Sequence, residues 1–357
     1  MECGTAQVRL TKALVVALFA LTPLFGWPRT PTTHAAGGAS DGRITLDVVV
    51  TGRSGNPVAG LTQQDFTILD DKRQNPIVAF NAVAEGTLGP PLRVVFVMDE
   101  VNVPFRSMAS ARQQLEKYLR RDGGQLPVPM SLVIFSEKST QVQGTPTRDG
   151  NLLADSVRAI GAGAPRELEG GQFENRVWRL QISLRAFGKL AAYEATQPGR
   201  KLLIWLGPGW PLITDSADRL TTKEQQEDFR ILVNLSTILR DGHVTAYSID
   251  PLGTDDAGTL GNVYYENFLD GVPSPSKFRS GSLTLGVLSV QSGGLVLNRS
   301  NDVASLIGTC VADAKSYYSL TFESRPAAHP DEYHDLRVTI GKPGMVGRTR
   351  TGYYAQP

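Results

Sequence analysis

Residues Leu92–Pro104, LRVVFVMDEVNVP, contain an unbroken apolar run that ends abruptly at Asp99. A run without polar alternation predicts a strand buried on both faces, as in parallel sheets. The helix-like segment Ser107–Arg121 follows it, so strand and helix make the first unit of an α/β fold. Ligands of open parallel sheets bind beyond the carboxyl ends of the strands. Asp99 therefore lies where such a domain is expected to work.

The same alternation of strands and helices extends from Leu92 to about Ala314. Further strands are expected at Val128–Phe135, Ser139–Gln143, Lys201–Leu206, Val244–Ile249 and Leu295–Leu297. Helices are expected at Gly150–Ile160, Phe173–Thr196, Thr222–Arg240, Leu283–Gln291 and Asp302–Ala314. This order predicts an α/β fold with a doubly wound, mostly parallel six-stranded sheet covered by helices on both faces.

Short strand patterns flank this region at both ends of the chain. They occupy Ile44–Thr51, Leu61–Leu69 and Pro76–Val83 before it, and Ser316–Glu323, Tyr333–Ile340 and Thr349–Tyr354 after it. Each set is too small to bury a core alone. We therefore expect residues 37–89 and 315–357 to form one β-sandwich, with an α/β domain of residues 90–314 inserted between them.

Residues 1–36 have the organisation of a secretory signal peptide. Arg9 and Lys12 precede the apolar run Ala13–Phe25, and the small residues Ala35-Ala36 offer a cleavage site. The run is shorter than the roughly 20 residues of a transmembrane helix, and an uncleaved anchor is the alternative. The sequence thus predicts a secreted or periplasmic protein with no membrane span after cleavage.

Charge and cysteine content narrow the class of protein. The formal net charge is +1 and charged residues make up 20% of the chain, which gives no electrostatic reason to expect a nucleic-acid partner. Cys310 is the one cysteine after the signal segment, and its helical surroundings predict a buried, inert thiol. No phosphate-binding loop, dinucleotide fingerprint or G-x-S-x-G motif occurs, so a nucleotide-dependent enzyme is disfavoured.

A set of short motifs along nearly the whole mature chain matches a known family. The motifs are Pro57–Thr62 with Asp65-Phe66, Met98–Asn102, Pro198–Lys201, Leu203–Trp205, Ala246–Pro251, Tyr317-Tyr318 and Gly352–Tyr354. In these motifs and their order the chain resembles the bacterial secreted VWFA-related proteins, which carry a von Willebrand factor type A domain. The resemblance implies a von Willebrand A-like fold. It also implies a divalent-cation site on a D-x-S-x-S loop, completed by a threonine and an aspartate from later loops.

The sequence departs from that cation site at most of its positions. Asp99 matches the leading aspartate, but Val101 and Val103 replace the two serines, and Gly207–Gly209 contains no acid. Hard cations need several oxygen ligands, and Asp99 with Asn102 does not supply them. We expect Asp99 to cap the first helix or to bond loop amides instead, as a remnant of the site. We predict no metal and no cofactor, in preference to weakly bound Mg²⁺ or Ca²⁺.

Two other clusters contain metal-binding residue types. His329–His334 lacks the helical H-E-x-x-H spacing and includes Pro330, so the sequence predicts a solvated turn there. Asp255-Asp256 lacks the spacing of a calcium-binding EF-hand and is expected in a flexible loop.

The long loop Pro251–Ser280 is expected at the same sheet edge as Asp99. It carries Tyr264 and Tyr265, and tyrosine is enriched in recognition surfaces because it is amphipathic. The alternative is an insertion whose aromatic side chains fold back onto the domain. The sequence favours neither of the two.

The function that this sequence favours is that of a secreted, non-enzymatic module for binding or adhesion. Its partner would be a protein or a cell-envelope component, bound at the carboxyl edge of the sheet. The candidate contact residues are Asp99, Glu100, Asn102, Trp210, Tyr264 and Tyr265. The alternatives are a metal-dependent hydrolase that uses Asp99 and Glu100, and a structural subunit of an envelope assembly.

Overall fold

Strand β5 (Leu92–Asp99), the apolar run, lies inside a six-stranded sheet of order β10-β9-β8-β5-β6-β7. The other strands are β6 (Gln125–Phe135), β7 (Thr140–Asp149), β8 (Arg200–Leu206), β9 (Val244–Ile249) and β10 (Val296–Leu297). All neighbours pair in parallel except β7, which closes one edge antiparallel to β6. This strand order is that of a doubly wound sheet, and the predicted fold class is confirmed.

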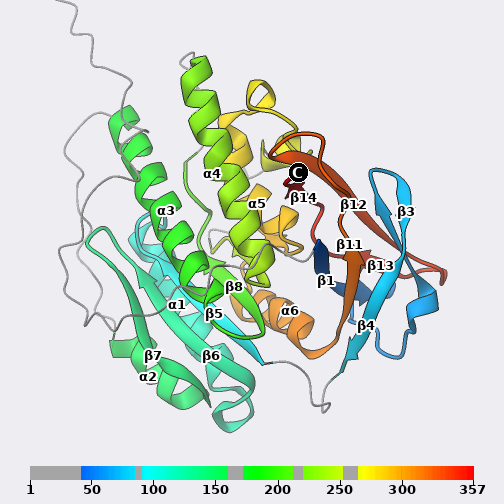
Figure 1. Cartoon of the computed structure of the whole chain (residues 1–357). Helices are drawn as coiled ribbons and strands as arrows, with labels where there is room; N and C mark the ends of the chain where they lie inside the picture. Colours follow the sequence, from blue (N-terminus) through cyan, green and yellow to red (C-terminus); the bar gives the residue numbers. More distant parts are fainter. Residues whose placement is uncertain (1–41, 85–90, 160–171, 212–219, 252–263, 299) are drawn as a thin grey trace, which may run out of the picture.

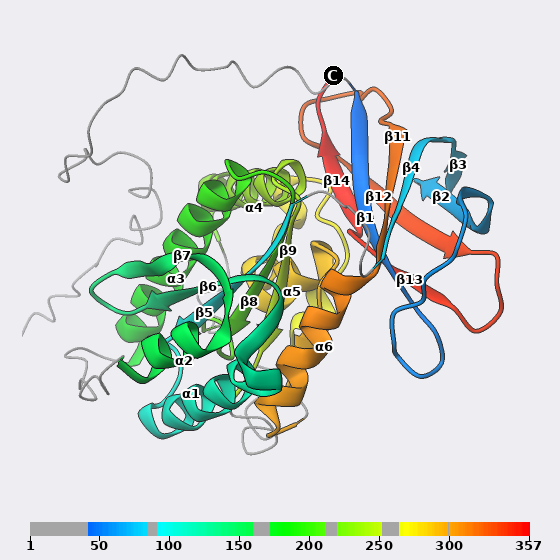
Figure 2. The same ribbon diagram turned by 90° about the horizontal axis from the view of Figure 1, so that it is seen from below.

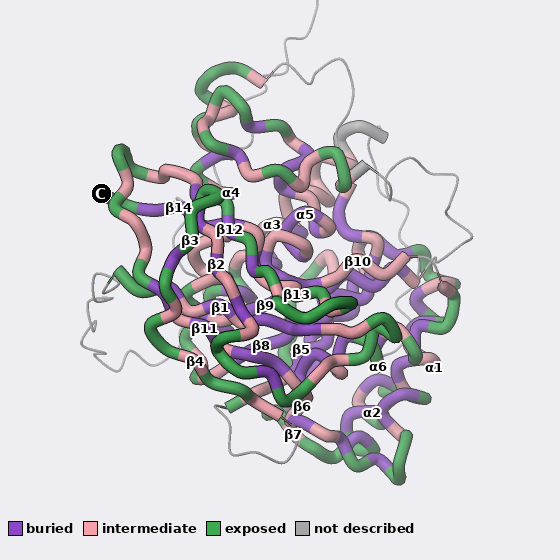
Figure 3. Tube along the Cα trace, turned by 90° about the vertical axis from the view of Figure 1, so that its right-hand side faces the viewer, coloured by how far each residue is buried: buried purple, intermediate pink, exposed green. Residues whose placement is uncertain are grey.

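The sheet is buried on both faces because helices cover each of them (Figure 1). One face packs against α1 (Phe105–Leu119), α2 (Gly150–Ala159) and α6 (Val303–Lys315). The other packs against α3 (Gln172–Ala195), α4 (Thr222–Asp241) and α5 (Leu285–Gln291). Along β5, alternate residues enter the two cores, with Phe96 on the first face and Val97 on the second. Strands β8 and β9 are buried along their whole length (Figure 3).

The computed structural model describes residues 42–84, 91–159, 172–211, 220–251, 264–298 and 300–357. The predicted signal peptide lies outside these residues. Short 3-10 helices within them are η2 (Gln63–Asp65), η3 (Arg121–Gly124), η5 (Tyr264–Phe268), η6 (Pro275–Lys277) and η7 (Ser280–Leu283). In this described part of the chain, no helix is both long and apolar enough to span a bilayer.

The two ends of the chain together form a second layered unit beside the α/β part (Figure 2). One sheet has the order β13-β1-β11-β4 and the other β14-β12-β2-β3. The strands from the first end are β1 (Arg43–Thr51), β2 (Phe66–Asp70), β3 (Arg73–Asn75) and β4 (Ile77–Val83). Those from the second end are β11 (Tyr317–Glu323), β12 (Glu332–Ile340), β13 (Val346–Arg348) and β14 (Gly352–Ala355). Both sheets mix strands from the two ends, and one shared core lies between them.

Three expectations about the β strands need correction. The short strands β3 and β13 were not predicted, because three residues are too few to show an alternating pattern. Strand β7 continues to Asp149, well beyond the predicted Ser139–Gln143. His334 is not in a solvated turn but lies on β12 with 4% exposure. It is in phase with the buried residues Leu336 and Val338, so the strand turns it inward.

A buried polar junction joins the sandwich to the α/β part. Asp313 on α6 accepts a hydrogen bond from the Tyr247 hydroxyl at 2.8 Å and forms an ion pair with Arg348 of β13. Arg200 at the start of β8 lies 3.6 Å from the Asp47 carboxylate of β1. Breaking a buried ion pair by removing one partner costs several kcal/mol, typically about 3–5. The two units therefore hold a defined orientation.

Truncation tests the dependence of β1 on the far end of the chain. Deleting Ser316–Pro357 removes both neighbours of β1, since β11 and β13 belong to that segment. We expect limited proteolysis to cut within Ile44–Phe80 in the truncated chain, but not in the intact one. Removal of Gln356 and Pro357 alone is the matched control and should leave the protection unchanged. Continued protection of Ile44–Phe80 in the long truncation would contradict the shared sandwich.

Candidate functional site

Asp99 closes the carboxyl end of β5, and protein donors surround its carboxylate. Its Oδ1 accepts the backbone N–H groups of Val101 at 3.0 Å and Asn102 at 2.9 Å. Its Oδ2 accepts the Asn102 side-chain amide and the indole N–H of Trp205, both at 2.8 Å. Asp99 is fully buried. Each oxygen thus receives two hydrogen bonds, which is the capacity of a carboxylate.

This network joins three elements that are distant in the sequence. Trp205 comes from β8, and the Asn102 amide also donates to the Ser183 hydroxyl of α3 at 2.9 Å. Gly207 allows the close approach, because a Cβ atom there would lie 2.8 Å from Asp99 Cβ. Asp99 therefore acts as a structural centre for the edge of the sheet. Of the two roles expected for Asp99, these contacts agree with bonding to loop amides, whereas the N-cap of α1 is Pro104.

Burial dominates the electrostatics of this centre. It raises the pKa of Asp99 above the usual range, and the hydrogen bonds that the carboxylate accepts oppose the rise. Arg179 lies one turn before Ser183 on α3, and burial lowers the pKa of its guanidinium while Asp99 opposes that change. Within the described residues, Asn102 Oδ1 and Arg179 Nε are buried without a hydrogen-bond partner. The network thus leaves one hydrogen-bond acceptor and one hydrogen-bond donor without a partner.

Glu100, the second carboxylate of the loop, is held by a different partner. It forms an ion pair with Arg112, about two helical turns into α1. Its backbone N–H donates to the Phe135 carbonyl at 2.9 Å. Both side chains of the pair are partly exposed, at 22% for Glu100 and 13% for Arg112. The Glu100 side chain therefore lies at the surface of the carboxyl edge, whereas the Asp99 side chain points into the domain.

The structure does not place the aromatic candidates on one exposed surface. Trp210 is 5% exposed, stacks edge-on against Trp205, and donates its indole N–H to the Leu283 carbonyl at 2.7 Å. The expectation that Trp210 contacts a partner does not fit this burial. Tyr265 in η5 is half-buried against Gly286 of α5, so here the loop folds back onto the domain. The Tyr264 side chain lies outside the described residues.

An exposed tip at the same edge was not predicted from the sequence. Pro104, Phe105 and Arg106 are all exposed where the Asp99 loop enters α1. The Phe105 side chain is 43% exposed, although it is apolar and large. A cavity of about 480 Å³ lies at the opposite edge of the sheet, lined by Tyr118, Arg121 and Lys315 among others.

Asp228 is an acid near the start of α4 with an unusual environment. It is 8% exposed on a helix that packs against the same core as Trp205. Burial raises the pKa of Asp228 to about 7, and the negative charges of Glu224 and Glu227 add to the rise. This carboxyl group therefore titrates near neutral pH.

No protein-family model and no curated protein matches the chain. Solved structures that resemble it include an aerotolerance-related membrane protein from Bacteroides fragilis, at 10% identity and a TM-score of 0.35, over 64% of this chain and 100% of that one. The VWA domain of SpRpn10 matches at 12% identity and a TM-score of 0.27, over 61% of this chain and 93% of that domain. The pilus adhesin SpaC from Lactobacillus rhamnosus GG matches at 10% identity and a TM-score of 0.35, over 82% of this chain and 49% of the adhesin. At these values the likeness supports no conclusion about the function of the chain.

The donors around Asp99 predict that magnesium does not stabilise the chain through this residue. A ligand that binds only the folded state raises stability by RT ln(1 + [L]/Kd), and Asp99 has no free acceptor position to offer. We expect chelator-treated protein to melt at the same temperature with and without millimolar Mg²⁺, measured by calorimetry. A Mg²⁺-dependent rise that disappears in Asp99→Asn would contradict the closed network.

The raised pKa of Asp228 predicts a pH-dependent stability. The folded chain holds this proton more tightly than the unfolded chain, in which the aspartate titrates near 3.8. The resulting stabilisation is fully present below about pH 4 and is lost as the pH rises through about 7. It amounts to roughly 4 kcal/mol at most. Urea unfolding of Asp228→Asn should show a flatter pH dependence between these values.

Asp241→Asn is the matched control for this measurement, because Asp241 lies at the other end of α4 and its side chain is 57% exposed. That variant should keep the pH dependence of the unmodified chain. An unchanged slope in Asp228→Asn would show that the carboxyl group titrates normally.

Proposed function

We propose that the chain is an exported, non-enzymatic binding module that contacts a protein or cell-envelope partner at the carboxyl edge of its α/β sheet. The observation that carries this proposal is the complete engagement of Asp99 by four protein donors. An acid in that state neither ligates a substrate-activating metal nor accepts a proton from a substrate. The hydrogen bonds of Asp99 thus make the carboxyl edge of the sheet rigid. The partner would be bound by the side chains around this edge.

The proposed contact surface, called the edge patch, consists of Glu100, Pro104, Phe105, Arg106 and Arg112. It combines an exposed aromatic ring with an exposed arginine, and a partly exposed ion pair lies beside them. Aromatic residues and arginine contribute most of the energy in many protein interfaces. A network that fixes the Asp99 loop also reduces the entropy lost when such a patch is bound.

The other candidate residues have supporting roles in this proposal. Asp99 and Asn102 hold the loop, and Trp210 packs against Trp205, which donates to Asp99. Tyr265 fixes the loop before α5, and Tyr264 stays a candidate contact. The metal-dependent hydrolase gains no support, because Glu100 is paired with Arg112 and Asp99 has no open oxygen. Export is inferred from Arg9, Lys12 and Ala13–Phe25.

Photocrosslinking at Phe105 tests the edge patch. A benzoylphenylalanine residue replaces Phe105 in one protein and Leu152 in another, since Leu152 on α2 is 57% exposed and lies outside the patch. Both are irradiated with cell-envelope extract of the source organism. We expect an adduct of defined mass at position 105 and none at position 152. Excess unmodified chain should suppress the adduct, whereas excess Phe105→Asp chain should not.

Two results would oppose the proposal. Equal labelling at both positions would indicate non-specific contact with the extract. Suppression of the adduct by the Phe105→Asp chain as well would show that the edge patch does not provide the binding surface.

A further inference from the structure

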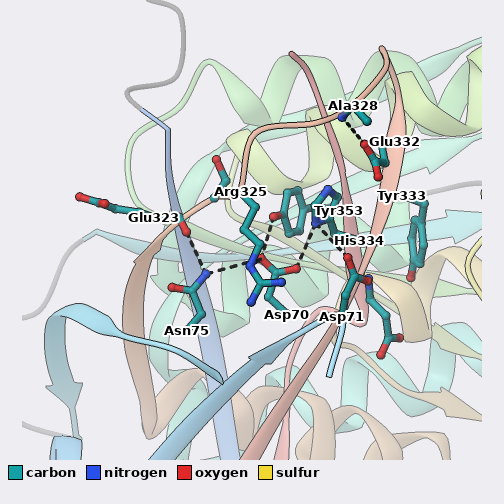
Figure 4. Close-up of polar contacts among 12 residues, drawn as sticks. Asp70, Asp71, Asn75, Glu323, Arg325, Ala328, Glu332, Tyr333, His334 and Tyr353 are labelled. Atoms are coloured by element: carbon teal, nitrogen blue, oxygen red, sulfur yellow. Dashed lines mark hydrogen bonds and ion pairs between the residues drawn. The ribbon is translucent and has the colours of Figure 1, made fainter. Parts of the chain in front are cut away.

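Two carboxylates and an imidazole meet within the β-sandwich (Figure 4). Asp70 is the last residue of β2, Asp71 follows in the turn to β3, and His334 lies on the neighbouring strand β12. Asp70 and His334 are buried, whereas the Asp71 side chain is 46% exposed. One oxygen or nitrogen from each residue lies within 4.8 Å of the others. We propose that these three side chains bind a divalent cation of the zinc class.

The distances between the three groups already approach those of a metal site. His334 Nδ1 lies 3.1 Å from Asp70 Oδ1 and 3.2 Å from Asp71 Oδ2. Zinc bonds to nitrogen and oxygen measure about 2.0–2.2 Å, so neighbouring ligands of a tetrahedral ion are roughly 3.3–3.5 Å apart. The two distances from His334 are therefore within a few tenths of an ångström of this spacing, and the two carboxylate oxygens lie within 4.8 Å of each other.

Each carboxylate has one oxygen held by the protein and the other turned toward His334. Asp70 Oδ2 accepts the Tyr353 hydroxyl at 3.1 Å, which leaves Oδ1 for the cation. Asp71 Oδ1 accepts the backbone N–H of Asp335 at 3.0 Å, which leaves Oδ2. Such outer hydrogen bonds orient the ligands of metal sites. The arrangement is one in which the ligands are set before the ion arrives.

The imidazole is also fixed in place. Its ring stacks on Tyr353 with centroids 4.8 Å apart and an angle of 22° between the planes. Among the described residues, Nε2 of His334 has no hydrogen-bond partner. A cation that binds at Nδ1 displaces any proton from that nitrogen to solvent, and the N–H of the neutral ring is then on Nε2. Without a cation, Nδ1 lies within hydrogen-bond distance of both acids.

The mixed donor set selects the type of cation. An imidazole nitrogen suits zinc and its transition-metal neighbours, whereas magnesium demands six oxygen ligands in octahedral geometry. Three protein ligands leave a fourth tetrahedral position, and Asp71 is the exposed member of the three. A water molecule or a ligand from a partner would fill it, as in zinc sites that keep one position open.

Calorimetric titration with Zn²⁺ tests the site in the untagged full chain after chelator treatment. We expect about one Zn²⁺ per chain, with Mg²⁺ binding much more weakly. Asp71→Asn should lower the zinc affinity by at least about 10-fold, and Tyr353→Phe, which removes only the outer hydrogen bond, by about 10-fold or more. Because Asp71 is exposed, Asp71→Asn should melt cooperatively, and this is checked before titration.

Two variants serve as controls, and Co²⁺ provides a second readout. Asp335→Asn and His329→Gln change an exposed acid and an exposed histidine of the same region, so they should leave the affinity unchanged. The visible absorption of bound Co²⁺ should show tetrahedral coordination and should be lost in His334→Gln. Absence of zinc binding, or binding that Asp71→Asn leaves intact, would overturn the proposal.

Discussion

Strand β1 depends on the opposite end of its own chain, since both of its sheet neighbours, β11 and β13, come from the last segment. Leu46 pairs with Leu320, and Val50 with Gly347. The sandwich therefore requires the two ends of the chain to meet across the intervening α/β part. The buried contacts of Asp313 with Arg348 and Tyr247 then fix the two units against each other.

Two buried aspartates differ in what their surroundings allow. Asp99 receives four hydrogen bonds from protein donors. Through these bonds and the contact of Asn102 with Ser183, its carboxylate links β5 to β8 and α3. Asp70 is equally buried, but one of its oxygens faces only His334. An acid that shares its free oxygen with a second acid and an imidazole can accept a cation, whereas a fully hydrogen-bonded acid cannot. The two buried aspartates thus have different roles, with Asp99 fixing the sheet edge and Asp70 belonging to the proposed cation site of the sandwich.

The doubly wound sheet could be predicted because its strands are continuous apolar runs and its helices begin and end at recognisable residues. The environment of Asp99 could not, since Trp205 and Ser183 are far from it in sequence and only the folded chain brings them together. The Asp70–His334 contact spans 264 positions, yet part of its signal was available. Asp70 follows Phe66 and Ile68 at alternate positions, and His334 precedes Leu336 and Val338 in the same way. Alternation thus predicts both polar side chains to point inward, although not toward each other.

The α/β part leaves the sandwich after Val83 and returns at Tyr317, and these two residues are paired across β4 and β11. A tensile force applied to the two ends of the folded chain is therefore carried by hydrogen bonds between strands of the sandwich. The α/β part lies on a side branch of this mechanical path and meets the loaded strands through side contacts such as that of Arg240 with the Tyr354 carbonyl. Tension on the chain would therefore act first on the sandwich and only through these contacts on the sheet.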